Sequence, residues 1–145
     1  MLSSAALFPR LEPAAAEAAA TREVVVLLVE DEDPLALLLT TLLSRMKVRV
    51  LRAADGAEAL KLISEHRAAI SLAFVDCQLP DTGGAELCRE LRGAAPGLPL
   101  LLTSGRDQRA LEVQLAAGGP CQFLPKPYMP ADVMRRVSAL LSPGG

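Results

Sequence analysis

Short apolar runs alternate with longer amphipathic segments along most of this chain. The apolar runs occupy residues 24–29, 48–51, 70–75, 98–103 and 121–124. Their length and their content of Val, Leu and Ile are typical of strands that helices cover on both faces. We therefore expect five strands, each followed by a helix, as in a parallel sheet built from βαβ units.

The segments between these runs place apolar residues at helical spacing. We expect Asp33 to cap the first helix and Pro34 to open it. The predicted buried stripe of this helix consists of Leu35, Leu38, Leu39, Leu42 and Leu43. Asp55 and Glu58 form a capping-box pattern that predicts the start of the second helix.

The later helices differ in how firmly their sequences anchor them. We expect the third to end at Gly93 and the last to begin at Pro130. Between them, residues 107–117 offer only Leu111 and Leu115 as strong core anchors. This helix should be the most weakly fixed of the set.

This strict alternation predicts one α/β domain over residues 23–142. The expected architecture is a flavodoxin-like, doubly wound, five-stranded parallel sheet of order 2-1-3-4-5 with five helices. Residues 1–22 are rich in alanine and contain Pro9 and Pro13, so we interpret them as a flexible tail or linker. We expect residues 143–145 to form a short C-terminal tail.

Polar residues follow four of the predicted strands at their C-terminal ends. Glu30 and Asp31 follow the first strand, Asp76 the third, Ser104 the fourth and Lys126 the fifth. Ligands bind at this edge of open α/β sheets, so we expect these side chains to converge there.

Three carboxylates in one place need a cation, because like charges that close cannot all stay ionised. Hard oxygen ligands favour Mg²⁺, and Mn²⁺ could replace it. Lys126 and Ser104 would contact phosphate oxygens. Together these groups suit phosphoryl transfer to a carboxylate, and the product would be an aspartyl phosphate.

At these residues the chain resembles the receiver domains of two-component response regulators. The motifs LLVEDE, FVDCQLP with GG following, LLTSG and LPKPY occur in order, and the resemblance covers about residues 23–142. It implies that Asp76 is the phosphoacceptor and that Lys126 is the family's lysine, which pairs with a phosphate oxygen or with Asp76. It also implies a metal site made of Asp31, Asp76, the backbone carbonyl of Gln78 and, through water, Glu30.

The same resemblance implies a conformational switch. Of the two hydroxyl residues in TSG we choose Ser104 over Thr103, because its spacing to Lys126 fits the family and Gly105 follows it. Thr103 would then end the strand. Phe123 occupies the aromatic switch position without a hydroxyl, so its rotation must depend on packing. The Lys126–Pro127 peptide bond is expected to be cis.

Composition narrows the classes of function. A net charge of −2 gives no basic surplus for direct nucleic-acid binding, and no apolar run approaches the roughly 20 residues that span a membrane. The three cysteines lack metal-site spacing and indicate reduced thiols in a cytoplasmic protein. We interpret Cys77 as a packing residue rather than a redox sensor, and His66 as a surface residue.

The leading hypothesis is therefore a phosphorylation switch, not an enzyme beyond its own phosphorylation and dephosphorylation. The phosphoryl donor would be a histidine kinase or a histidine phosphotransfer protein. The alternative is a pseudo-receiver that acts as an interaction module without phosphorylation. A phosphohydrolase is disfavoured, because Gln78 stands where that class usually has a second aspartate. The sequence leaves open whether the chain is a single-domain regulator or the receiver of a hybrid kinase.

Overall fold

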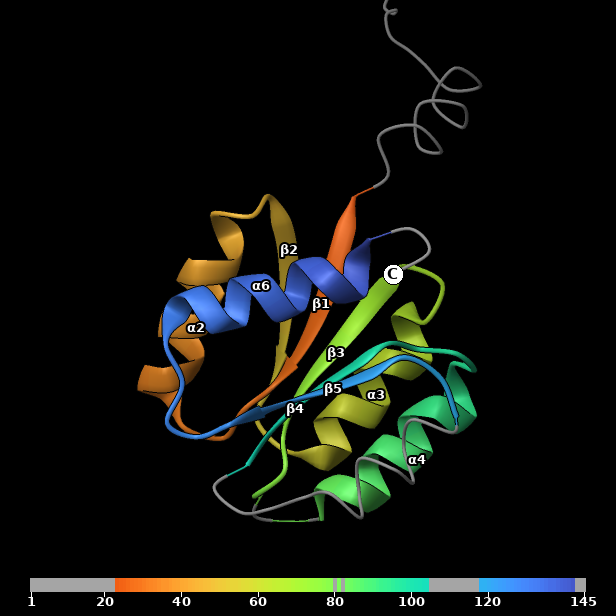
Figure 1. The fold of residues 1–145 in the computed structure, drawn as a ribbon. Helices are drawn as coiled ribbons and strands as arrows, with labels where there is room; N and C mark the ends of the chain where they lie inside the picture. Colours follow the sequence, from red (N-terminus) through yellow and green to blue (C-terminus); the bar gives the residue numbers. More distant parts are fainter. Residues whose placement is uncertain (1–22, 80, 82, 105–117, 143–145) are drawn as a thin grey trace, which may run out of the picture.

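Five parallel strands form one sheet in the computed structural model, which describes residues 23–79, 81, 83–104 and 118–142. The strands are β1 (Val24–Val29), β2 (Val48–Ala53), β3 (Ile70–Asp76), β4 (Leu100–Ser104) and β5 (Cys121–Pro125). Their order is β2-β1-β3-β4-β5, and every neighbouring pair is parallel (Figure 1). The predicted fold class is confirmed.

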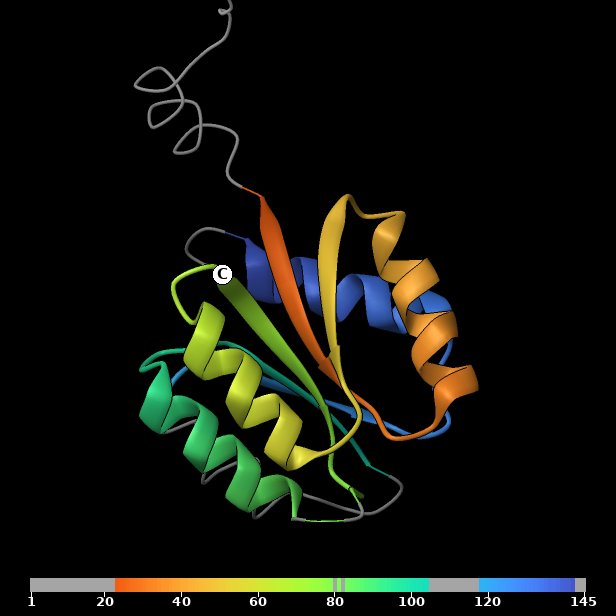
Figure 2. The same cartoon turned by 180° about the vertical axis from the view of Figure 1, so that it is seen from behind.

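Helices cover both faces of the sheet. On one face lie α2 (Asp33–Ser44) and α6 (Pro130–Leu141), and on the other lie α3 (Gly56–His66) and α4 (Gly84–Ala94) (Figures 1 and 2). The helix predicted within residues 107–117 lies outside the described residues. No helix in the described part of the chain combines the length and the apolar character needed to cross a membrane.

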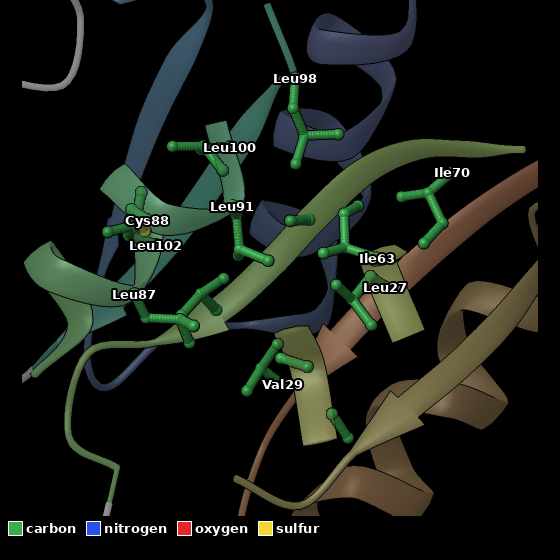
Figure 3. Packing of buried hydrophobic residues seen from close by; sticks show 14 of the residues in the cluster. Leu27, Val29, Ile63, Ile70, Leu87, Cys88, Leu91, Leu98, Leu100 and Leu102 are labelled. Carbon is green, nitrogen blue, oxygen red and sulfur yellow. The ribbon is translucent and has the colours of Figure 1, made fainter. Parts of the chain in front are cut away.

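The interior strand β1 is buried because its side chains alternate between two hydrophobic clusters. Leu27 and Val29 point into the cluster beneath α3 and α4 (Figure 3), whereas Val26 and Leu28 point into the cluster beneath α2 and α6. A strand covered on both faces has no position left for a polar side chain. Polar residues of the central strands are therefore confined to their ends.

The stripe predicted for α2 is partly wrong. Leu39, Leu42 and Leu43 are buried, but Leu38 is 59% exposed, and Ala36 is buried in its place. The helix carries leucines around more of its circumference than the sheet can contact, so tertiary packing selects the buried face.

The predicted cap of α2 also differs. Glu32 is the N-cap residue and makes no side-chain capping bond, while Pro34 stands in the first turn as expected. Asp33 is the first residue of the helix, and its Oδ1 lies 2.9 Å from Nη1 of Arg52 on β2. An ion pair with the neighbouring strand thus replaces the predicted capping role of Asp33.

Candidate functional site

The acidic residues meet because β1 and β3 pair in register up to their C-terminal ends. Val29 pairs with Val75, so the chain reaches Glu30 and Asp76 at the same edge of the sheet. One carboxylate oxygen each from Glu30, Asp31 and Asp76 lies within 4.8 Å of the others. The structure thus brings together the three predicted acidic residues.

Burial differs sharply among these three side chains. Glu30 is 2% exposed and Asp76 is 4% exposed, whereas Asp31 is exposed to solvent. The group therefore has a buried floor and one solvent-facing carboxylate. Such an arrangement leaves room for a cation that keeps some of its own waters, as Mg²⁺ does.

Among the residues that the structure describes, Lys126 is the one that pairs its positive charge with the acceptor carboxylate. Its Nζ lies 3.3 Å from Oδ1 of Asp76, and the backbone N–H of Gln78 donates to the same oxygen at 2.9 Å. Within the described residues both hydrogen bonds accepted by this carboxylate end on Oδ1. One lysine cannot balance three carboxylates, so the donor set and its charge fit a divalent cation.

The pKa of Glu30 is raised because its carboxyl group is buried. Burial raises the pKa of its carboxyl from the ordinary 4.5 to about 7, and the negative charge of Asp76 adds to the rise. The backbone N–H of Glu32, which donates to Glu30 Oε2 at 3.2 Å, opposes it. Near neutral pH, Glu30 is therefore partly protonated.

The predicted switch residues lie on the two strands beyond β3. β4 continues one residue past Thr103, which is buried, and Ser104 pairs with Pro125 through the backbone. The expectation that Thr103 ends the strand is therefore wrong, because pairing with β5 extends to Ser104. The Ser104 side chain lies outside the described part of the structure, and its switch role stays a prediction.

Phe123 is half-buried and packs against the cluster beneath α3 and α4. Its backbone carbonyl accepts a hydrogen bond of 2.7 Å from Nη1 of Arg136 on α6. This hydrogen bond links the edge strand β5 to α6, which lies on the face of the sheet opposite to the Phe123 side chain. A rotation of the Phe123 side chain stays a prediction.

Two further expectations concern backbone groups. The Lys126–Pro127 peptide bond is cis, as predicted. Gln78 is exposed and forms an isolated antiparallel bridge with Gly83. The role of the Gln78 carbonyl as a metal ligand stays a prediction.

Tyr128 is a neighbour of the site that the sequence did not reveal. Its hydroxyl is buried and has no hydrogen-bond partner in the described part of the chain. Burial raises the pKa of Tyr128 to about 12, and the charges of Glu30 and Asp76 add to this rise. Its place two residues after Lys126 was the only available signal.

Asp81 is a second residue that sequence reasoning missed. Its carboxylate accepts hydrogen bonds from the N–H groups of Gly56 and Ala57, at 2.9 and 3.1 Å. Asp55 accepts from Glu58 N at 2.8 Å as predicted, so two aspartates satisfy the first turn of α3. This contact anchors the segment that follows Asp76 to α3. No local pattern links residues 25 positions apart.

The thiol beside the acceptor shows no sign of redox reactivity. Cys77 is half-buried, packs against the core, and has a pKa that burial raises to about 12. A thiol with so high a pKa stays protonated near neutral pH and is a poor nucleophile. This agrees with the predicted packing role.

A family model, a sequence relative and two solved structures relate this chain to response regulators and their receiver domains. The family model described as "Response regulator receiver domain" matches residues 26–138. The Response regulator MprA of Mycobacterium tuberculosis (strain ATCC 25618 / H37Rv) is 36% identical over 87 residues, which are 60% of this chain and 37% of that protein. The chain therefore spans under two fifths of the length of such relatives.

Solved structures of receiver domains also resemble this chain. The receiver domain of the hybrid histidine kinase CckA is 32% identical, with a TM-score of 0.69 over 81% of this chain and 99% of that one. A CheY-like receiver domain protein from Methanospirillum hungatei JF-1 is 26% identical, with a TM-score of 0.72 over 82% of this chain and 94% of that one.

Proposed function

Because this chain belongs to the response regulator receiver domain family, we propose that it accepts a phosphoryl group on Asp76 and thereby switches a partner-binding surface. Receiver domains are signalling modules in general, rather than enzymes that turn over a separate substrate. The observation that carries the proposal is the joint placement of Asp76, Lys126 and two further carboxylates at one edge of the sheet.

In the proposed reaction a carboxylate oxygen of Asp76 attacks phosphorus. A new O–P bond forms, and the bond between phosphorus and its donor atom breaks. With phosphohistidine as the donor, the electron pair of that bond returns to the imidazole nitrogen. Lys126 is placed to pair with the phosphoryl oxygens, because its Nζ already contacts the acceptor carboxylate.

Asp31 and Asp76 would hold Mg²⁺ directly, Glu30 would act through water, and the Gln78 carbonyl would be the third protein ligand. When bound, the ion neutralises charge on the carboxylates and on the transferred group. Mn²⁺ has similar oxygen preferences and is expected to substitute. The buried state of Glu30 and Asp76 supports this assignment, since their negative charges lack enough cationic partners in the described part of the site.

The proposed donor is a histidine kinase or a histidine phosphotransfer protein. The similarity to the receiver domain of the hybrid histidine kinase CckA supports this class of partner. The proposed readout passes through Ser104 and Phe123 to an unknown downstream protein, with no direct contact to nucleic acid or membrane. The proposed location is the cytoplasm.

The proposal is tested by incubating the protein with acetyl phosphate and Mg²⁺ and weighing it intact. We expect the mass of one added phosphoryl group in the wild type and in Asp132→Asn, which removes a carboxylate of α6 that pairs with Arg135. Asp76→Asn should show no increase. An unmodified wild type would favour the pseudo-receiver, and an increase that survives Asp76→Asn would reject Asp76 as the acceptor.

A further inference from the structure

Three nitrogen atoms of the Arg52 side chain, on β2, contact the segment that carries Glu30 and Asp31. Its Nε and Nη2 donate to the backbone carbonyl of Glu30 at 3.0 and 2.8 Å. Its Nη1 lies 2.9 Å from Oδ1 of Asp33. One guanidinium therefore holds the chain on both sides of Asp31, the solvent-facing member of the acidic group.

We propose that Arg52 is a positioning residue for the metal site of the proposed function. The inference rests on that function, because it assumes that Mg²⁺ binds at Glu30, Asp31 and Asp76. Arg52 acts through the backbone of Glu30 and through Asp33. It therefore sets where the Asp31 carboxylate stands rather than providing a ligand.

The backbone of Glu30 shows why this support is needed. Its N–H still donates to the carbonyl of Ala53 at 3.0 Å, which continues the ladder between β1 and β2. Its carbonyl is where the chain leaves the sheet, and two N–H groups of Arg52 satisfy it. Without these two hydrogen bonds, the Glu30 carbonyl would lose the protein donors that hold the turn leading to Asp31 in place.

The charges around Arg52 give a second reason to assign it a positioning role. Residues 30–33 read Glu-Asp-Glu-Asp, four acidic side chains in succession. The ion pair with Arg52 holds Asp33 against β2, while Glu30 and Asp31 stay in the acidic group. Arg52 thus separates the carboxylates that would bind metal from one that would compete with them.

The shape of the guanidinium matters as well as its charge. A planar fork can serve two acceptors at fixed angles, whereas a lysine ammonium is a point charge on a flexible stem. Arg52→Lys therefore keeps the charge and loses the fork. Arg52→Met loses both and keeps most of the apolar stem.

The two variants separate positioning from simple electrostatics. If Arg52 acted only through its charge, Arg52→Met would bind Mg²⁺ more tightly, because a cation near the site would be gone, and Arg52→Lys would match the wild type. Positioning predicts weaker binding in both. Arg49→Met is the matched control, because Arg49 lies on the same strand, is 59% exposed and pairs with Glu23 at 3.7 Å.

The experiment is an equilibrium Mg²⁺ titration of the four proteins, followed by fluorescence and repeated by calorimetry. Tyr128 is the single tyrosine of a chain without tryptophan, and its buried hydroxyl senses the charges of Glu30 and Asp76. Circular dichroism in the absence of Mg²⁺ identifies a temperature at which each variant is folded. A role confined to fold stability would change the melting curve and leave the dissociation constant unchanged.

We expect the Mg²⁺ dissociation constant to rise about tenfold in Arg52→Lys and Arg52→Met, as for residues that orient metal ligands, and to stay unchanged in Arg49→Met. Wild-type binding in Arg52→Lys, or tighter binding in Arg52→Met, would overturn the inference. If Arg52→Met does not fold, Arg52→Lys decides alone. Failure of the wild type to bind Mg²⁺ would instead contradict the metal site of the proposed function.

Discussion

Glu30 should make the stability of this domain fall as pH rises from mildly acidic to neutral. In the folded state burial raises the pKa of its carboxyl from 4.5 to about 7. Between these two values the folded protein keeps the proton and the unfolded chain releases it. The folded state binds more protons in this window, so the free energy of unfolding decreases with increasing pH.

The size of the effect follows from the two pKa values. Each unit of separation between the folded and unfolded pKa corresponds to about 1.4 kcal/mol, so the full contribution of Glu30 is about 3 kcal/mol. This loss of stability is fully present above pH 7, where Glu30 is ionised in both states, and it is absent below pH 4.5, where Glu30 is protonated in both states. Over the accessible range from pH 5 to 8 we expect the free energy of unfolding to fall by about 2.5 kcal/mol.

The perturbation is Glu30→Gln, which keeps the size of the side chain and removes its titration. Urea unfolding followed by far-ultraviolet circular dichroism gives the free energy of unfolding at each pH, without Mg²⁺. The difference in the free energy of unfolding between wild type and variant isolates Glu30, because all the other side chains are common to both proteins. Glu90→Gln, which changes an exposed glutamate of α4, is the control and should keep the wild-type slope.

A difference between wild type and Glu30→Gln that is flat from pH 5 to 8 would refute the reasoning. Saturating Mg²⁺ should also reduce the wild-type slope, since a bound divalent ion favours the ionised carboxylate. An unchanged slope with Mg²⁺ bound would place the ion away from Glu30.

Two further predictions concern packing. Leu39→Ala in α2 should lower the free energy of unfolding by about 2–5 kcal/mol, whereas Leu38→Ala should change it by less than about 0.5 kcal/mol; equal losses by urea unfolding would contradict the observed helix face. Gly84→Ala should cost about 1–3 kcal/mol, because the new Cβ would lie 2.5 Å from the Cα of Cys77. Gly93→Ala, in the same helix with open space around it, should stabilise the protein by up to about 1 kcal/mol, and a Gly84→Ala protein as stable as this control would reject the clash.

The alternation of apolar strands and amphipathic helices was sufficient to predict the architecture. Residues such as Leu27 and Leu28 are apolar in succession because helices bury both faces of β1, and a run of this kind is readable without coordinates. The same logic predicted that Glu30, Asp31, Asp76 and Lys126 would meet, because parallel strands present their C-terminal ends at one edge.

The tertiary structure decided which of several equivalent local choices is used. The leucines of α2 form a surface wider than its contact, and only docking on the sheet distinguishes Leu39 from Leu38. Asp33 could cap its own helix by sequence, but Arg52 reaches it from a strand 19 positions away in the chain. Sequence patterns report neighbours within about one helical turn or along one strand, so contacts of this kind leave no local signal.

The chemistry around the acceptor divides in the same way. The sequence determined which ionisable groups lie at the sheet edge, since residue type and strand position are both readable from it. Only the fold decided that Glu30 is buried while Asp31 stays exposed, that Asp81 anchors the segment after Asp76, and that the Tyr128 hydroxyl is enclosed. Burial and pKa depend on what covers a side chain, and in this domain the covering groups come from distant parts of the chain.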